Sequence, residues 1–297
     1  MSDKTKRISL VLGSGGARGL AHIGIIRSLV ERGYKIESIS GCSIGALIGG
    51  IYAAGKLEEY AKWISGIDKF GIFSLLDFSF GRSGLVKGEK LIAKLKELVG
   101  ETLIEDLPIS FTAVAADITR EREVWISKGP LFDAIRASIS LPLFFTPFRY
   151  KGVHLVDGGI FDPVPIAPTY HDVTDLTIAV NLNGAQELEE ALQSQPAKKG
   201  GENGLQLFRE KVGDFIARFW PDDKSEGQED LDMFYIASQS FDAMQGVIAR
   251  QKLAAHPPDV LIEIPRDACS ILDFDQAKSL IDLGYRIAEK RLSELAQ

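Results

Sequence analysis

The N-terminal half of the chain alternates short apolar runs with segments whose apolar residues recur at helical spacing. Residues 7–12 form an apolar run that ends in glycines, and residues 20–32 carry apolar positions three and four residues apart. A second run at 36–40 precedes an apolar helical segment from 44 to about 54. Strands and helices that alternate across short turns are typical of a parallel α/β fold.

The remaining elements extend this pattern to the C-terminus. Further strands are predicted at 109–115, 123–127, 153–156, 176–182 and 260–264, and further helices at 90–99, 131–138, 231–252 and 275–292. Two polar stretches, 184–203 and 222–230, are predicted to be irregular surface loops. No internal repeat is visible. We therefore expect one domain over 1–297, an α/β fold with a mainly parallel central sheet and helices on both faces.

Composition narrows the classes of function. The 297 residues include 34 basic and 41 acidic side chains, a net charge of −7, so the basic footprint of nucleic-acid binding is absent. The first apolar run is too short for a signal peptide, and no run of about 18 apolar residues predicts a spanning helix. Two cysteines, Cys42 and Cys269, make no disulfide framework. We expect a cytoplasmic protein without a nucleic-acid partner, for which transient peripheral contact with a membrane surface stays open.

Gly41-x-Ser43-x-Gly45 fits a nucleophile elbow, because it falls between a predicted strand and a predicted helix. In such an elbow the serine hydroxyl stands clear of the sheet, and the helix dipole lies beneath the oxygen that gains negative charge. The alternative is a serine that only caps the helix. The motif alone does not decide between the two.

The glycine-rich turn after the first strand, residues 13–19, has two functional interpretations. As a nucleotide cradle it needs an acid at the end of the second strand, which instead reads Ser-Gly-Cys-Ser, and the Walker pattern is also missing. As an oxyanion loop it would direct the Gly15 and Gly16 amides at the Ser43 hydroxyl, because the carboxyl ends of neighbouring parallel strands meet at one edge. A tight turn for close helix packing is compatible with both.

Four blocks in this order resemble the patatin-like phospholipase family. They are Gly15-Gly16-Ala17-Arg18-Gly19, Gly41-Cys42-Ser43-Ile44-Gly45, Ala137-Ser138-Ile139-Ser140-Leu141-Pro142 and Asp157-Gly158-Gly159. A fifth, Gly84-Leu85-Val86-Lys87-Gly88, is similar to the bacterial, neuropathy-target-esterase-like branch. The resemblance covers roughly residues 7–182 well and the C-terminal extension loosely. Asp162 departs from the pattern, since many relatives carry Asn there.

The resemblance implies a patatin-like three-layer architecture and an acyl hydrolase that needs neither metal nor cofactor. It implies Ser43 as nucleophile, Asp157 as base, and Gly15, Gly16 and Arg18 as the oxyanion loop. The implied substrates are phospholipids, lysophospholipids or neutral lipids. It makes no prediction of the oligomeric state.

A carboxylate is a weak base toward a hydroxyl, but burial raises its pKa and strengthens it. A serine–aspartate–histidine triad is the alternative. Of the four histidines, His22 falls on a helix and strand alternation puts His154 on the face opposite Asp157. His171 and His256 lie in predicted loops, from which either could complete a triad.

Two segments dense in large apolar residues, 70–80 and 141–148, are predicted to be mostly core. Phe144 and Phe145 are the candidates for the wall of an acyl pocket. Three other functions stay open: a soluble esterase or thioesterase for small acyl groups, a weakly active regulatory protein that keeps the fold, and a nucleotide-binding module.

Overall fold

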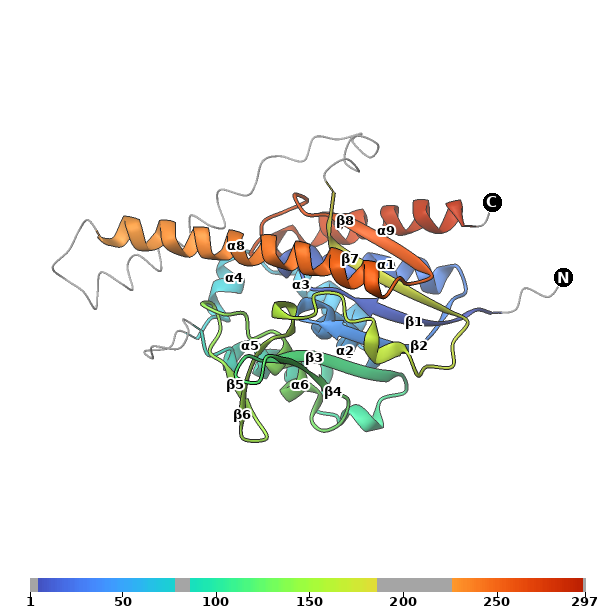
Figure 1. The fold of residues 1–297 in the computed structure, drawn as a ribbon, viewed down its shortest axis with the longest axis horizontal. Coiled ribbons are helices and arrows are strands. Elements are labelled where there is room, and N and C mark those ends of the chain that lie inside the picture. Colours follow the sequence, from blue (N-terminus) through green and yellow to red (C-terminus); the bar gives the residue numbers. More distant parts are fainter. Residues whose placement is uncertain (1–4, 78–85, 186–225, 296–297) are drawn as a thin grey trace.

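The computed structural model describes residues 5–77, 86–185 and 226–295, and a mixed, mainly parallel sheet runs through its middle (Figure 1). Within these residues the strand order is β5-β6-β3-β2-β1-β7-β8, with β4 also paired to β3. Strands β1, β2, β3, β7 and β8 are parallel, whereas β4 and β6 run antiparallel to β3. The strands are β1 (Arg7–Leu12), β2 (Lys35–Cys42), β3 (Ser110–Asp117), β4 (Arg122–Ile126), β5 (Phe148–Tyr150), β6 (Val153–Asp157), β7 (Leu176–Gly184) and β8 (Val260–Pro265).

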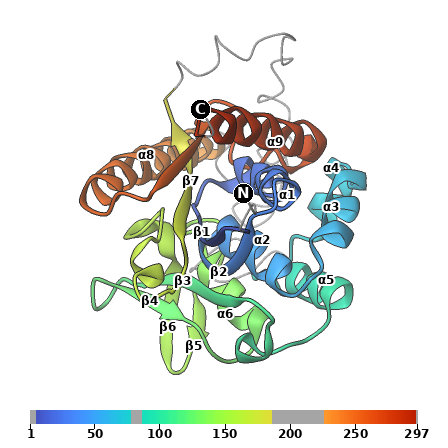
Figure 2. The same ribbon diagram turned by 90° about the vertical axis from the view of Figure 1, so that its right-hand side faces the viewer.

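Helices cover both faces of the sheet, which gives three layers (Figure 2). Helix α8 lies along one face, and α1, α2, α6 and α9 lie on the other, with α3, α4 and α5 outside them. The helices are α1 (Ala21–Glu31), α2 (Ile44–Ala53), α3 (Leu57–Gly66), α4 (Lys69–Ser74), α5 (Glu89–Val99), α6 (Leu131–Ser138), α8 (Glu226–Ala255) and α9 (Ala277–Glu294). Short 3-10 helices occupy Gly16–Leu20, Ile104–Asp106, Gly158–Ile160, Ala167–Thr169 and Phe274–Gln276.

The two faces of β1 belong to two cores, as strand alternation requires. Ile8, Leu10 and Leu12 enter the large core that the sheet shares with α1, α2, α6 and α9. Val11 points the other way, into a small core closed by Ala249 of α8. The predicted sheet with helices on both faces is therefore confirmed.

The structure also corrects the sequence analysis. Helices α3 and α4 and strand β5 were not predicted, and the loop predicted at 222–230 is wrong from Glu226 onward, where α8 begins. The two apolar segments predicted to be mostly core are mostly half-buried instead. In residues 70–77 Phe70 is 76% exposed, and in residues 141–148 Phe144 is the one buried residue and Leu143 is 56% exposed. Residues 78–80, 84–85, 186–203 and 222–225, named above, lie outside the described ranges.

No helix in the described ranges has both the length and the apolar character needed to cross a membrane.

A buried arginine joins α6 to the segments on either side of it. Arg136 is 5% exposed, and its guanidinium donates to the Lys87 carbonyl (3.0 Å from Nε), to the Thr146 carbonyl (2.9 Å) and to the Ser140 hydroxyl (2.6 Å). Its plane also lies over the Phe145 ring, 5.2 Å from the ring centroid. These contacts hold residues 86–88 against residues 144–146, where Val86 and Phe145 form an isolated bridge.

Replacing this arginine should be costly. Arg136→Met leaves two backbone carbonyls and a hydroxyl without donors, which should lower the free energy of unfolding by roughly 2–4 kcal/mol. Arg27→Met, which removes the exposed Arg27–Glu58 ion pair, is the matched control and should cost less than about 1 kcal/mol. Urea unfolding monitored by circular dichroism measures both. Equal losses would show that the buried network contributes no more than a surface pair.

Candidate active site

The serine of the elbow motif lies in the turn between β2 and α2. The Ser43 backbone has φ 55° and ψ −123°, a region that residues other than glycine rarely adopt. A Cβ added at Gly41 would lie 2.5 Å from the Gly45 carbonyl oxygen, and a Cβ added at Gly45 would lie 2.1 Å from the Leu12 carbonyl oxygen. Glycine at both positions thus permits the sharp strand-to-helix turn of a nucleophile elbow.

The end of α6 holds this turn in place. The Ser43 N–H donates to the Ser138 hydroxyl (2.8 Å), which in turn donates to the Val114 carbonyl of β3 (2.6 Å). Ser138 is fully buried. Its supporting role was not foreseen, and the signal available was a serine inside the Ala-Ser-x-x-x-Pro block.

Strand β6 brings Asp157 to Ser43. Cys42, the last residue of β2, pairs with Val114 of β3, and Asp157 pairs with the next residue, Ala115. Because β4 occupies the opposite edge of β3, β6 takes over the edge at which β2 ends. The Ser43 hydroxyl donates to Asp157 Oδ2 at 2.5 Å.

The Asp157 carboxyl group is fully buried and has three donors around it. Besides Ser43 at Oδ2, the Gly159 N–H donates to Oδ1 at 2.8 Å, and the Cys42 thiol lies 3.9 Å from Oδ1. Burial raises the pKa of Asp157 from 3.8 to about 6, the largest effect, while these hydrogen bonds oppose it. The group therefore accepts a proton more readily than an ordinary carboxylate near neutral pH.

The four histidines, all within the described ranges, form no hydrogen bond with Asp157 or Ser43. His22 lies behind the glycine loop, with Nε2 2.9 Å from the Gly13 carbonyl, and burial lowers its pKa to about 4. His154 points to solvent from β6, opposite Asp157, and His256 packs against the Tyr170 ring. His171 is exposed in a turn.

Two amides of the glycine loop have no acceptor among the described residues, and one of them, that of Gly16, lies at the cavity of Ser43. Three of its N–H groups are bonded, Gly13 to Val180, Ser14 to Pro163 and Ala17 to Ile271. In the described part of the chain the Gly15 and Gly16 N–H groups have no acceptor. Gly16, with φ 59°, lines the same cavity as Ser43, so its N–H is an unpaired donor at that point.

Arg18 belongs to this loop but not to the cavity. It is 1% exposed, and its Nε donates to the Gly15 carbonyl at 3.1 Å. Its terminal nitrogens bond the Arg266 carbonyl (2.7 Å) and the Asp242 carboxylate of α8. The guanidinium thus lies behind the loop rather than facing Ser43.

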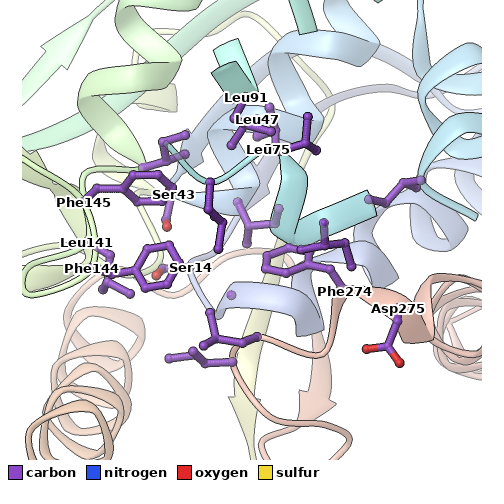
Figure 3. A pocket seen from close by; sticks show the side chains of 18 of the residues that line it. Ser14, Ser43, Leu47, Leu75, Leu91, Leu141, Phe144, Phe145, Phe274 and Asp275 are labelled. Carbon is purple, nitrogen blue, oxygen red and sulfur yellow. The ribbon is translucent and has the colours of Figure 1, made fainter. Parts of the chain in front are cut away.

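Ser43 opens into an apolar cavity of about 170 Å³. Figure 3 shows Ser43, Ser14 and Phe144 gathered near one end and Phe274 and Asp275 near the other. The predicted Phe144 and Phe145 both line it, edge to face with ring centroids 4.8 Å apart. Many of the other walls come from α3 and α4, helices that the sequence analysis did not predict, and from the two residues after α4: Tyr60, Trp63, Ile64, Ile72, Phe73, Leu75 and Leu76.

Asp162, the departure from the family pattern, lies in a second buried group. Its carboxylate is 1% exposed and lies 3.6 Å from the Lys252 ammonium of α8, which also pairs with Glu123. Burial and the nearby Glu123 carboxylate raise the pKa of Asp162 to about 8. No three His, Cys, Asp or Glu side chains in the described residues form a group able to hold a metal ion.

The fold of this chain is similar to that of a solved structure. The chain superposes on VipD from Legionella pneumophila with a TM-score of 0.56 over 98% of this chain and 67% of that one, at 17% identity. That likeness concerns the fold alone.

Sequence comparison finds proteins that are more similar to this chain than VipD is. An uncharacterized NTE family protein of Mycobacterium bovis is 37% identical over 98% of this chain and 92% of its own length. Lysophospholipase NTE1 of Candida glabrata is 27% identical over 98% of this chain, which spans only 16% of that protein. Residues 10–170, with the elbow, the glycine loop and Asp157, match the sequence model described as patatin-like phospholipase. The chain therefore belongs to the patatin-like phospholipase family, within its NTE branch.

Proposed function

We propose that the protein is a serine acyl hydrolase that cleaves lipid carboxylic esters with a Ser43–Asp157 dyad. The observation that carries this is the 2.5 Å hydrogen bond from the Ser43 hydroxyl to a fully buried carboxylate at an apolar cavity. The relatives named lysophospholipases support a lipid ester as the substrate.

The reaction begins with the proton of Ser43. As its oxygen attacks the ester carbonyl carbon, the proton moves to Asp157 Oδ2, and the carbonyl oxygen becomes an oxyanion near the free Gly15 and Gly16 amides. The carbon–oxygen bond to the alcohol then breaks, and Asp157 returns the proton to the leaving oxygen. The acyl group remains on Ser43.

Deacylation uses the same groups. Asp157 takes a proton from water, the hydroxide attacks the acyl carbon, and the proton returns to the Ser43 oxygen as the fatty acid leaves. One buried carboxylate with a pKa of about 6 can thus serve both half-reactions, because it binds and releases a proton near neutral pH.

The nucleophile can be identified covalently. A fluorophosphonate should label Ser43, and Ser43→Ala should lower ester turnover by roughly 10⁴-fold or more, because the acyl-enzyme cannot form. Peptide mapping by mass spectrometry locates the label. Labelling of Ser14, the other serine that lines the cavity, or full activity of Ser43→Ala would contradict the assignment.

If Asp157 is the base, both kcat/KM and stability should depend on pH. For the wild type, kcat/KM should rise with pH and reach half its plateau near pH 6, as Asp157 loses its proton. Asp157→Asn should remove nearly all turnover.

The same substitution should also change stability, with a sign fixed by the raised pKa. The folded protein binds the Asp157 proton more tightly than the unfolded chain, so Asp157 favours the folded state at low pH and loses this contribution as the pH passes about 6. Asp157→Asn should therefore be more stable than the wild type at pH 8, by up to roughly 3 kcal/mol, and equal to it below pH 4. Thermal unfolding across pH tests this. If the stability of the wild type relative to Asp157→Asn rises with pH, Asp157 is not a buried base with a raised pKa.

Acyl-chain length separates a lipid esterase from an esterase or thioesterase for small acyl groups. Each methylene buried in the cavity is worth about 0.8 kcal/mol, so kcat/KM should rise about fourfold per methylene along a p-nitrophenyl ester series until the cavity is full. Phe144→Ala should flatten that rise, whereas Phe70→Ala, at an exposed position, should leave it unchanged. A maximum at acetyl or butyryl esters would favour the small-acyl alternative.

A further inference from the structure

Two residues on one face of α8 contact the glycine loop. Asp242 and Gln245 are three positions apart, so their side chains project to the same side of the helix. Asp242 pairs with Arg18, and the Gln245 amide donates to the Ser14 hydroxyl at 3.0 Å. Both lie outside residues 10–170, the part of the chain that matches the family model.

The contact through Arg18 acts on the peptide unit that joins Gly15 to Gly16. The Gly15 carbonyl and the Gly16 N–H belong to one planar trans peptide, so they point in opposite directions. Arg18 Nε holds that carbonyl at 3.1 Å, on the side away from the cavity. The Gly16 N–H is thereby directed toward the cavity that Gly16 and Ser43 line together.

Arg18 in turn needs its own partner. It is 1% exposed, and the Asp242 carboxylate binds both of its terminal nitrogens. A paired carboxylate restricts the planar guanidinium to one orientation more strongly than a neutral acceptor would. The only other acceptor of a terminal nitrogen within the described ranges is the Arg266 carbonyl.

Gln245 makes a second contact that reaches both halves of the site. It is 2% exposed, and its Nε2 would lie 2.0 Å from a Cβ added at Gly159. Its amide therefore packs directly on the residue whose N–H donates to Asp157. The same amide holds Ser14, one residue before the Gly15–Gly16 step.

We propose that α8 is a positioning element of the active site. Asp242 fixes Arg18, which orients the Gly16 N–H as an oxyanion donor, and Gln245 fixes Ser14 beside the Asp157 turn. This inference rests on the proposed function, because it assigns a task to the Gly16 amide in ester cleavage. Neither side chain of α8 is asked to take part in the proton transfers.

The test compares two ion pairs that each join a helix to a distant segment. Asp242→Ala should lower kcat by about 10- to 100-fold with KM within about twofold, because a misdirected donor is missed only in the transition state. Glu289→Ala breaks the ion pair between α9 and Arg32, the residue that follows α1, and should lower the melting temperature while leaving kcat unchanged. In an Arg18→Met background, Asp242→Ala should cost less than about twofold more in kcat, since its effect passes through Arg18.

A second readout does not depend on activity. Hydrogen–deuterium exchange of the peptide that contains Gly15 and Gly16 should rise at least about tenfold in Asp242→Asn and stay unchanged in Glu289→Ala. If the wild type cleaves no ester, the proposed function fails, and the exchange result alone decides the positioning role. Unchanged exchange, or a kcat within twofold of an active wild type, overturns it.

Discussion

The site depends on one change of partner along a single strand edge. Strand β3 pairs with β2 up to Val114 and with β6 from Ala115, so the end of one strand and the end of another meet without a gap. One strand carries the serine turn and the other ends in the carboxylate. Because backbone pairing fixes register to a single residue, the hydroxyl and the carboxylate come within hydrogen-bond distance without any flexible connector.

This placement has an energetic consequence. An ionised carboxylate at 0% exposure is unfavourable unless donors surround it, and the Ser43 hydroxyl and the Gly159 N–H compensate only part of the cost. The remainder keeps the proton affinity of Asp157 high. In a triad, histidine supplies a base with a pKa near neutrality, and here burial moves a carboxylate into that range. Burial of Asp157 therefore has two effects: it destabilises the folded protein when the carboxylate is ionised, and it makes a histidine unnecessary in the proposed reaction.

The sequence predicted the features that local geometry determines. The turn needs glycine at positions 41 and 45 because carbonyl oxygens occupy the space that a Cβ would fill. The two glycines of the motif therefore follow directly from these backbone contacts. Parallel pairing of the first two strands placed the glycine loop beside Ser43 by the same logic. Helix α3 has a regular apolar stripe of Leu57, Tyr60, Ala61 and Ile64 that joins the large core, so its pattern was present in the sequence and was overlooked. Helix α4 has only six residues, too few to show a helical period.

Contacts between distant segments could not be predicted, and they complete the site. Ser138 supports the Ser43 backbone from 95 residues away, and Asp242 reaches Arg18 across 224. Nothing in the composition of α8 distinguishes Asp242 from a solvated acid. The role assigned to Arg18 also changes once Asp242 is known to be its partner. From the motif alone the positive charge belongs to the oxyanion loop. In the proposed positioning role, Arg18 is 1% exposed, is paired with Asp242 and acts on the cavity through the Gly15 carbonyl that it holds. On this proposal Arg18 of the motif and Asp242 of the C-terminal extension act together, and the site extends beyond residues 10–170, the part of the chain that matches the family model.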